Sequence, residues 1–497
     1  MDNLKIHDRV KRRISFAVLC LFLLSLLSCA SSNETYEVKA GSTDGVTEST
    51  ETSSVPEGDG LPELDLDGWE LAILNYDETQ LTWANTRILV DEADGDILND
   101  ALYKRNSELM ERFNFTLRVD EVAHVIDHIK NYVSAGDDTY DIYVMQEGQL
   151  LGYMPYILDW NSIPGLRLDE AWWNPEATSV YNIAGEQTAL AGNMTLTAVS
   201  RAVSIVFNKR IWNEYGDPSQ SLYDLVYDNE WTIDKFIELS RSVCSDLNGD
   251  TVWDEDDLYG MFMGRGFKGY IASFLCASNM NFTEPDESGR QHFTLNTNER
   301  GLELIKKLLD AWQSDGYTYY TGDVHTGAPA DFFEGGHALF SQRVPNDIYR
   351  LRDMNDDIGI LPMPKYDEEQ ENYCSAAWGG AVWTLSATFD PDGGEAEGMG
   401  VVLDALSYYG WRDVVPVYKE VALKTKTTRD EDSAAMLDII FDTIYFDFGT
   451  NILYDAVIAD GMLNRIYKSG SSDSMISIME SELARVEKYI DDIYSGE

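Results

Sequence analysis

Buried strands alternate with helices after residue 65, and this order limits the possible fold more than any other feature of the chain. Apolar runs of strand length occupy residues 69–74, 115–119 and 140–145. Apolar residues at helical spacing fill residues 100–113, which begin with a potential cap at Asn99–Asp100, and residues 125–133. A strand–helix–strand order of this kind predicts an α/β domain with a largely parallel sheet.

The ends of these strands are the first candidate positions for a ligand. In open α/β sheets, ligands bind beyond the carboxyl ends of the strands. Here those ends are Asn75–Tyr76 and the segment 146–149, which begins with Gln146 and Glu147.

Two extended runs farther along the chain predict connections to a second domain. Residues 190–212 (LAGNMTLTAVSRAVSIVFNKRIW) contain no compact turn, and residues 376–383 (AAWGGAVW) form a shorter run of the same kind. Helices are expected near 232–241 and 301–315, and they dominate from about residue 396, with a strongly amphipathic one at 472–494.

The N-terminal segment has the pattern of a secretory signal. A basic cluster precedes an apolar run at residues 14–27, which is shorter than the ~20 residues of a membrane-spanning helix. The ending Leu26-Leu27-Ser28-Cys29 resembles the lipobox of bacterial lipoproteins, although Leu27 is bulkier than usual. We therefore expect residues 1–28 to be a lipoprotein signal peptide and Cys29 to be lipidated. An uncleaved anchor or an ordinary signal peptide is the alternative.

Residues 29–65 are expected to be a flexible tether, because Ser, Thr, Glu and Gly dominate and large apolar residues are nearly absent. The chain of 497 residues has 44% hydrophobic residues, which is enough for a sizeable core beyond this tether.

The formal net charge is −50, and such a field repels nucleic acid and anionic lipid and argues against a polyanionic ligand. Of the five cysteines, only Cys244, Cys276 and Cys374 lie beyond residue 29. They allow one disulfide at most and have no metal-ligand spacing.

Residues 246–257 have the spacing of an EF-hand calcium loop. Oxygen ligands stand at loop positions 1, 3, 5, 9 and 12, and the carbonyl of Val252 stands at position 7. The predicted ligands are Asp246, Asn248, Asp250, Val252, Asp254 and Asp257. Thr251 occupies the position that normally requires glycine, and Asp257 replaces the usual glutamate, as in dockerin-type loops, which this loop resembles. We expect a structural calcium ion here and no organic cofactor; a solvated acidic loop is the alternative.

Other chemical motifs are weak. His124 and His128 have the spacing of a zinc pair, but they lack the intervening glutamate of a zinc protease, and a surface helix explains them better. Pairs of carboxylates carry no signal in a chain with 87 acidic residues. No nucleophile-elbow serine, phosphate-binding loop or Cys–His arrangement stands above chance.

Aromatic residues in expected loops are better candidates, because sugar rings pack on exposed aromatic faces. Most of them are expected to be core residues. Trp378 is the strongest candidate, since small residues flank it and leave room for a stacked ring. The set comprises Trp160, Trp172, Trp173, Tyr270, Trp378 and Trp383.

Taken together, these pieces resemble the extracellular solute-binding proteins of bacterial ABC transporters, specifically the carbohydrate-type family 1. The resemblance covers most of the chain after the signal, and its specificity comes from the order of several weak motifs. These are the lipobox, Arg105–Asn106 leading to Phe113–Asn114, and residues 136–141, 206–209, 230–232, 257–260, 359–366 and 426–436.

The resemblance implies a two-lobed α/β fold of the type II periplasmic-binding-protein kind, with the ligand cleft between the lobes. Lobe 1 would comprise residues 66–199 plus 376–412, and lobe 2 residues 200–375 plus 413–497. It implies that a carbohydrate, in most members an oligosaccharide, is captured by hinge closure and delivered to the permease subunits of an ABC importer. The protein would be a monomer held at the outer face of the cell membrane by its lipid, and no enzyme.

The family does not fix the contact residues. A ligand site is therefore predicted from position alone, at Gln146 and Glu147 after a lobe 1 strand, Tyr270 in lobe 2 and Trp378 at a crossing. Two other functions stay open: a secreted glycan-active enzyme, and a glycan-binding surface lipoprotein without a transporter. Dockerins carry two calcium loops and this chain has one, which counts against the enzyme.

Overall fold

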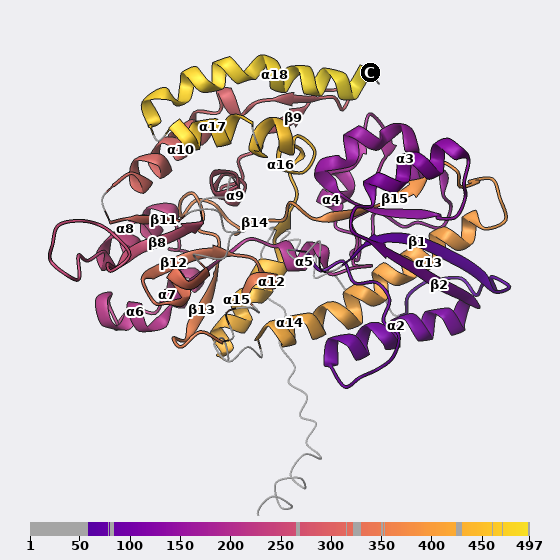
Figure 1. The fold of residues 1–497 in the computed structure, drawn as a ribbon, viewed down its shortest axis with the longest axis horizontal. Coiled ribbons are helices and arrows are strands. Elements are labelled where there is room, and N and C mark those ends of the chain that lie inside the picture. Colours follow the sequence, from indigo (N-terminus) through magenta and orange to yellow (C-terminus); the bar gives the residue numbers. More distant parts are fainter. Residues whose placement is uncertain are drawn as a thin grey trace, which may run out of the picture. The chain divides into compact units, whose positions relative to one another are not determined.

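The computed structural model describes the chain from residue 58 onward, with short gaps (Figure 1). The signal segment, Cys29, the tether up to residue 57 and residues 426–429 of the last family motif lie outside the described residues. Among the described helices, none is both long enough and apolar enough to cross a membrane. The described residues are 58–77, 79, 84–264, 269–314, 316–321, 330–348, 351, 353–423, 430–459, 461–469 and 471–495.

A first five-stranded sheet contains the three predicted strands of the N-terminal part. β1 is parallel to both of its neighbours, β2 and β3, and Ile73 of β1 lies opposite Ile142 of β3. β15 runs antiparallel to β3 and to β4, so residues far along the chain complete this sheet. The strand order is β2 (Phe115–Val122), β1 (Trp69–Tyr76), β3 (Ile142–Gln146), β15 (Ala381–Ser386) and β4 (Ile157–Leu158).

The two predicted helices of this part are α2 (Ile97–Phe113) and α3 (Ile126–Ala135). The expected cap at Asn99–Asp100 is wrong, because the side chain of Asp96 accepts hydrogen bonds from the amides of Leu98 and Asn99 and starts α2 three residues earlier. Both helices end at a residue in the left-handed conformation, Asn114 and Gly136.

A second five-stranded sheet is built from residues 204–362. β8 is parallel to β11 and β12, whereas β7 is antiparallel to β12 and β13. The strand order is β11 (Thr318–Thr321), β8 (Tyr259–Gly264), β12 (Ala338–Arg343), β7 (Ser204–Asn208) and β13 (Ile358–Pro362). Helices of this part are α6 (Lys209–Tyr215), α7 (Leu222–Tyr227), α8 (Ile233–Val243), α9 (Tyr270–Ala277), α10 (Glu299–Trp312), α11 (Ala330–Glu334) and α12 (Pro345–Ile348).

The predicted run at 190–212 is not continuously extended. Leu190 pairs with Trp383, and the chain then forms the short helix α5 (Thr197–Arg201) before β7 begins. Within α5, the amide of Ser200 donates to the carbonyl of Leu196 and its hydroxyl donates to that of Thr197. Polar Thr and Ser side chains thus satisfy a turn that the apolar pattern does not reveal.

Residues 396–423 form a further connection between the two sheet regions. α13 (Ala396–Tyr409) continues through the π-helical turn Gly410–Val414 into α14 (Val415–Leu423). This helical unit contacts α2 of the first region, and α14 also contacts α12 and α15 (Figure 1). At the π-helical turn, a β-carbon on Gly410 would lie 1.8 Å from the carbonyl oxygen of Asn193, so only glycine fits there.

Helices dominate the C-terminal part, as predicted. α18 contacts α17 (Figure 1) and the hairpin strand β10. The C-terminal elements are α15 (Glu431–Asp442), β16 (Ile444–Tyr445), α16 (Phe448–Asn451), a π-helical turn at Asp455–Ala459, α17 (Met462–Ser469) and α18 (Met475–Ser495). The remaining short α-helices and strands are α4 (Pro175–Val180), β5 (Asn182–Ile183), β6 (Glu186–Gln187), β9 (Thr283–Pro285), β10 (Gln291–Phe293) and β14 (Ser375–Ala376). Short 3-10 helices cover Glu147–Tyr156, Trp160–Ser162, Leu295–Thr297 and Ser472–Ser474.

The carboxylate of Asp404, on α13, organises part of the first region's core. Asp404 is fully buried and accepts hydrogen bonds from the indole nitrogens of Trp172 (3.0 Å) and Trp173 (2.8 Å). Arg167 donates to the same carboxylate from Nε (2.8 Å) and Nη2 (2.6 Å). Trp172 and Trp173 are therefore core residues tied to α13 and do not offer faces to a ligand.

We expect Asp404→Asn to lower the free energy of unfolding by about 1.5–3 kcal/mol, because it removes the charge of a buried carboxylate that accepts hydrogen bonds from Arg167, whose own side chain is 29% exposed. Urea denaturation followed by circular dichroism measures this. Asp413→Asn is the matched control, since Asp413 pairs with Arg412 at the surface and such pairs contribute about 0–1 kcal/mol. Equal effects of the two changes would contradict the role given to Asp404.

Candidate functional site

The carboxylate of Glu147 joins three distant segments of the chain. Glu147 follows β3 and is only 3% exposed. Its Oε2 accepts hydrogen bonds from the hydroxyl of Tyr181 (2.7 Å) and from Nδ2 of Asn451 (2.9 Å). Its Oε1 accepts from the amide of Gly379, and its own amide donates to the carbonyl of Gly380 (3.2 Å). Burial raises the pKa of Glu147, and these hydrogen bonds to the carboxylate oppose that rise.

A small cavity lies beside Glu147. Its volume is about 20 Å³, which is room for about one water molecule. Sites that enclose small organic ligands have volumes of about 300–1,000 Å³, so a sugar can enter only if the walls of this cavity move apart. The walls come from segments around both crossings: Glu147, Tyr181, Ala191, Gly192, Thr195, Thr197, Ala198, Arg201, Ala377, Trp378, Gly380, Ala381, Val382, Trp383 and Phe446.

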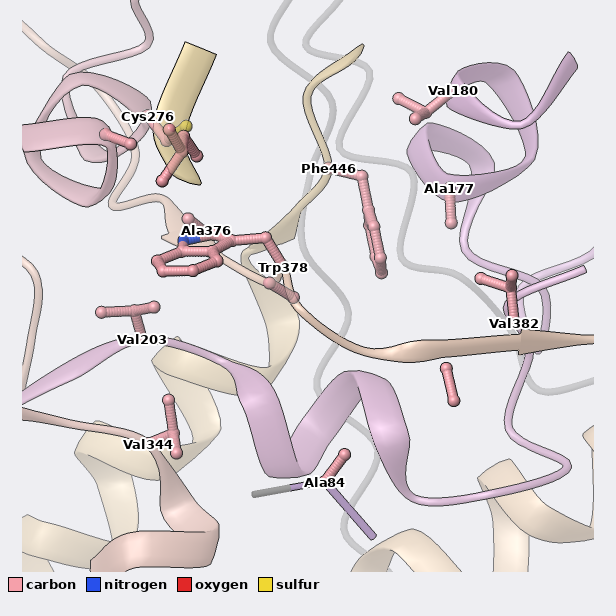
Figure 2. Packing of buried hydrophobic residues seen from close by; sticks show 14 of the residues in the cluster. Ala84, Ala177, Val180, Val203, Cys276, Val344, Ala376, Trp378, Val382 and Phe446 are labelled. Carbon is pink, nitrogen blue, oxygen red and sulfur yellow. The ribbon is translucent and has the colours of Figure 1, made fainter. Parts of the chain in front are cut away.

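Trp378 is a buried wall of this cavity and is 6% exposed. Its carbonyl accepts hydrogen bonds from Nε (3.1 Å) and Nη2 (3.0 Å) of Arg201, whose guanidinium lies 5.9 Å from the centroid of the Trp378 ring. In the view of Figure 2, Trp378 lies in the middle of the apolar cluster, with Val203 on one side and Phe446 on the other.

The small residues around Trp378 do not leave open space, so the predicted room for a stacked ring beside them is absent. Gly379 has a φ of 73°, and a β-carbon there would lie 3.1 Å from Nη2 of Arg201. A β-carbon on Gly380 would lie 2.6 Å from the methyl group of Thr197. Because these glycines have no side chain, the crossing segment can approach α5 closely.

The structure brings two of the four predicted ligand residues, Glu147 and Trp378, to one cavity. Gln146 is the last residue of β3 and pairs with Ala381, which also lines the cavity. Tyr270 begins α9, is 2% exposed and does not line the cavity. The preceding residue, Gly269, contacts Trp378, because a β-carbon on Gly269 would lie 2.1 Å from the indole ring.

Sequence patterns missed two polar residues of this site. Arg201 lies in the run that was expected to be extended, and Asn451 lies among the C-terminal helices. Burial lowers the pKa of the Arg201 guanidinium, while the carboxylate of Glu147 has the opposite effect. Asn451 donates to both Glu147 and the carbonyl of Ala377 (3.0 Å). A single polar residue in a helix gives no sequence signal for such contacts.

The predicted calcium loop is closed by its own backbone. Asp246 accepts hydrogen bonds from the amides of Gly249 (2.6 Å) and Thr251 (2.8 Å), and Thr251 has a φ of 67°, the left-handed conformation that normally favours glycine. The fully buried Asp257 accepts from the amides of Leu247 (3.0 Å) and Asp254 (3.1 Å).

The side chains of Asn248, Asp250 and Asp254 also accept hydrogen bonds from amides of the loop. The side chain of Asn248 accepts from the amide of Asp250, and that of Asp250 accepts from the amide of Val252. In the part of the chain that the structure describes, no group of three or more His, Cys, Asp or Glu side chains is placed to hold a metal ion. Calcium at this loop stays a prediction.

Neither a protein-family model nor a curated protein sequence matches the chain. Solved structures do match it. A cyclic alpha-maltosyl-1,6-maltose binding protein from Arthrobacter globiformis is 15% identical, with a TM-score of 0.57 over 84% of this chain and 99% of that chain. A cyclo/maltodextrin-binding protein complexed with maltotetraose is 14% identical, with a TM-score of 0.53 over 85% of this chain and 96% of that chain.

A third similar structure is a family 1 extracellular solute-binding protein from Bifidobacterium longum subsp. infantis. It is 12% identical, with a TM-score of 0.51 over 84% of this chain and 99% of that chain. At such low identity, what is shared is the arrangement of the chain. This chain therefore has the two-lobed α/β fold of type II periplasmic binding proteins, as it occurs in extracellular solute-binding proteins of family 1.

Proposed function

We propose that this protein binds a carbohydrate of the oligosaccharide class and delivers it to the permease of an ABC importer. The observation that carries the proposal is the position of the cavity at Glu147 and Trp378, in a fold shared with sugar-binding proteins. Its walls come from the residue directly after β3, from α5 and the segment before it, from β15 and the segment before it, and from Phe446 between β16 and α16.

The chemistry of these walls suits a neutral sugar. The cavity is lined by the aromatic rings of Trp378, Trp383 and Phe446, on which the apolar faces of sugar rings pack. Among the described lining residues, Glu147 carries the one negative charge and Arg201 the one positive charge, so their formal charges balance and favour a ligand without net charge.

Capture would proceed by hinge motion between the lobes. The division into residues 66–199 plus 376–412 and residues 200–375 plus 413–497 is part of this proposal. Because the present cavity is far smaller than a sugar, the lobes must open first. A ligand that touches both lobes only in the closed state then drives closure by its differential contacts.

A binding role is favoured over glycoside hydrolysis. Hydrolysis of a glycosidic bond requires a pair of carboxyl groups on either side of it. Glu147 is the single carboxylate among the described residues that line the cavity, and its oxygens are occupied by hydrogen bonds from Tyr181, Asn451 and Gly379.

A thermal-shift screen with maltose, maltotriose, maltotetraose and cyclodextrins tests the proposal. We expect a saturable rise in melting temperature with at least one glycan, since a ligand at 100 times its Kd adds about 2.7 kcal/mol to the free energy of unfolding. Trp378→Ala should abolish the rise.

Trp411→Ala, which changes a partly exposed tryptophan that packs on Tyr408 away from the cavity, should leave the rise unchanged. Release of shorter sugars during incubation with labelled oligosaccharides would refute the receptor and favour the enzyme. Absence of any glycan-dependent shift across a broad library would refute carbohydrate binding.

We further propose that Cys29 carries the lipid that holds the protein at the outer face of the membrane, with residues 30–65 as its tether. Cys29→Ala should move the protein from the membrane fraction to the medium, as measured by fractionation and immunoblotting, without changing its affinity for glycan. A change in affinity would show that the tether is more than a passive spacer.

We also propose that calcium stabilises the loop 246–257, because the six predicted oxygen ligands follow one another at EF-hand spacing. Removing calcium with EGTA should lower the melting temperature, and added calcium should restore it. Asp250→Asn should weaken this response, whereas Asp256→Asn, at a loop position without a predicted ligand, should retain it. A melting temperature that EGTA leaves unchanged would contradict calcium binding.

A further inference from the structure

Tyr454 packs against Trp378, the residue on which the proposed function places the sugar. We propose that Tyr454 covers the stacking face of Trp378 while the protein is free of ligand, and that a glycan must displace it to bind. The inference rests on the proposed function, and it adds a residue that competes with the ligand for the same aromatic surface.

The ring geometry supports this competition. The centroids of the Tyr454 and Trp378 rings are 6.0 Å apart and the ring planes are inclined by 34°. Aromatic pairs interact at centroid distances of about 4.5–7 Å. The planes are closer to parallel than to perpendicular, so the two rings meet as a tilted pair and not edge to face.

Tyr454 also reaches the other side of the predicted site. A β-carbon on Gly148 would lie 3.6 Å from Cδ1 of Tyr454, so the tyrosine ring contacts the chain directly after Glu147. The same ring thus spans the space between the end of β3 and the crossing that carries Trp378. These are two of the places where the ligand is proposed to bind.

Two other neighbours of Trp378, Gly269 and Arg201, are harder for a ligand to displace. Gly269 contacts the edge of the indole with its backbone, and Arg201 is held by two hydrogen bonds to the Trp378 carbonyl. A ligand can displace a tyrosine ring by rotating its side chain, whereas displacing Gly269 requires the backbone to move.

The backbone around Tyr454 is anchored on both sides, so a rotation of the ring need not disturb the fold. Asn451 is held by Glu147 and by the carbonyl of Ala377, and Leu453 and Ala456 are fully buried. Tyr454 itself is partly exposed and stands directly before the π-helical turn Asp455–Ala459. Such turns are frequent at functional sites.

The first test is binding of maltotetraose, followed by isothermal titration calorimetry. If Tyr454 competes with the ligand, Tyr454→Ala tightens binding about 2- to 10-fold, which corresponds to the strength of one aromatic pair. Tyr454→Phe keeps the ring and should bind like the wild type. Tyr489→Ala, at an exposed tyrosine of α18, is the control and should also bind like the wild type. Weaker or unchanged binding by Tyr454→Ala would overturn the inference.

A second measurement tests, without any ligand, whether Tyr454 covers Trp378. Oxidation by N-bromosuccinimide, mapped by peptide mass spectrometry, reports how accessible each indole is. Oxidation of Trp378 should be faster in Tyr454→Ala than in the wild type or in Tyr454→Phe, while Trp172, held by Asp404, serves as the internal reference.

Equal oxidation rates of Trp378 in all variants would show that Tyr454 does not cover it. Failure of this inference can be distinguished from failure of the proposed function. If no glycan binds the wild type but the oxidation rates differ as expected, the proposed function is wrong and the cover is real.

Discussion

The buried carboxylate of Glu147 is the interaction on which the arrangement of the site depends. Three donors from distant parts of the chain converge on it: Tyr181, the amide of Gly379 and Asn451, which is 304 residues away. A buried carboxylate is stable only when such donors surround it. Because the donors come from the first sheet region, the crossing and the C-terminal helices, satisfying this one group fixes how the three segments meet.

Much of the fold could be predicted because its signals are local. The strands at Trp69–Tyr76 and Ile142–Gln146 are short apolar runs, and α2 between them has apolar residues at helical spacing. The boundaries were less accurate where a side chain decides them, as at Asp96, which caps α2 before the apolar pattern begins. The prediction that residues 190–212 are extended is wrong for a similar reason. They contain α5, a short helix in which Ser200 bonds to neighbouring carbonyls.

The site was only partly predictable, because its contacts join residues that no pattern connects. Glu147 could be placed from its position after a strand, and Trp378 from its position in a crossing. Arg201 and Asn451 could not, since their partners are 177 and 304 residues away. The glycines beside Trp378 were interpreted as free space, whereas in three dimensions they allow the backbone to approach α5. A glycine looks the same in the sequence in either role.

The size of the cavity also determines the order of events in binding. A space of about 20 Å³ admits a water molecule and is far too small for a sugar ring, so the cavity as it stands does not hold the proposed ligand. Under the proposed function, opening therefore precedes capture, and at high ligand concentration the rate of association is set by how often the walls part, not by diffusion. On this proposal, the close packing of the cavity walls also sets the rate at which the ligand is captured.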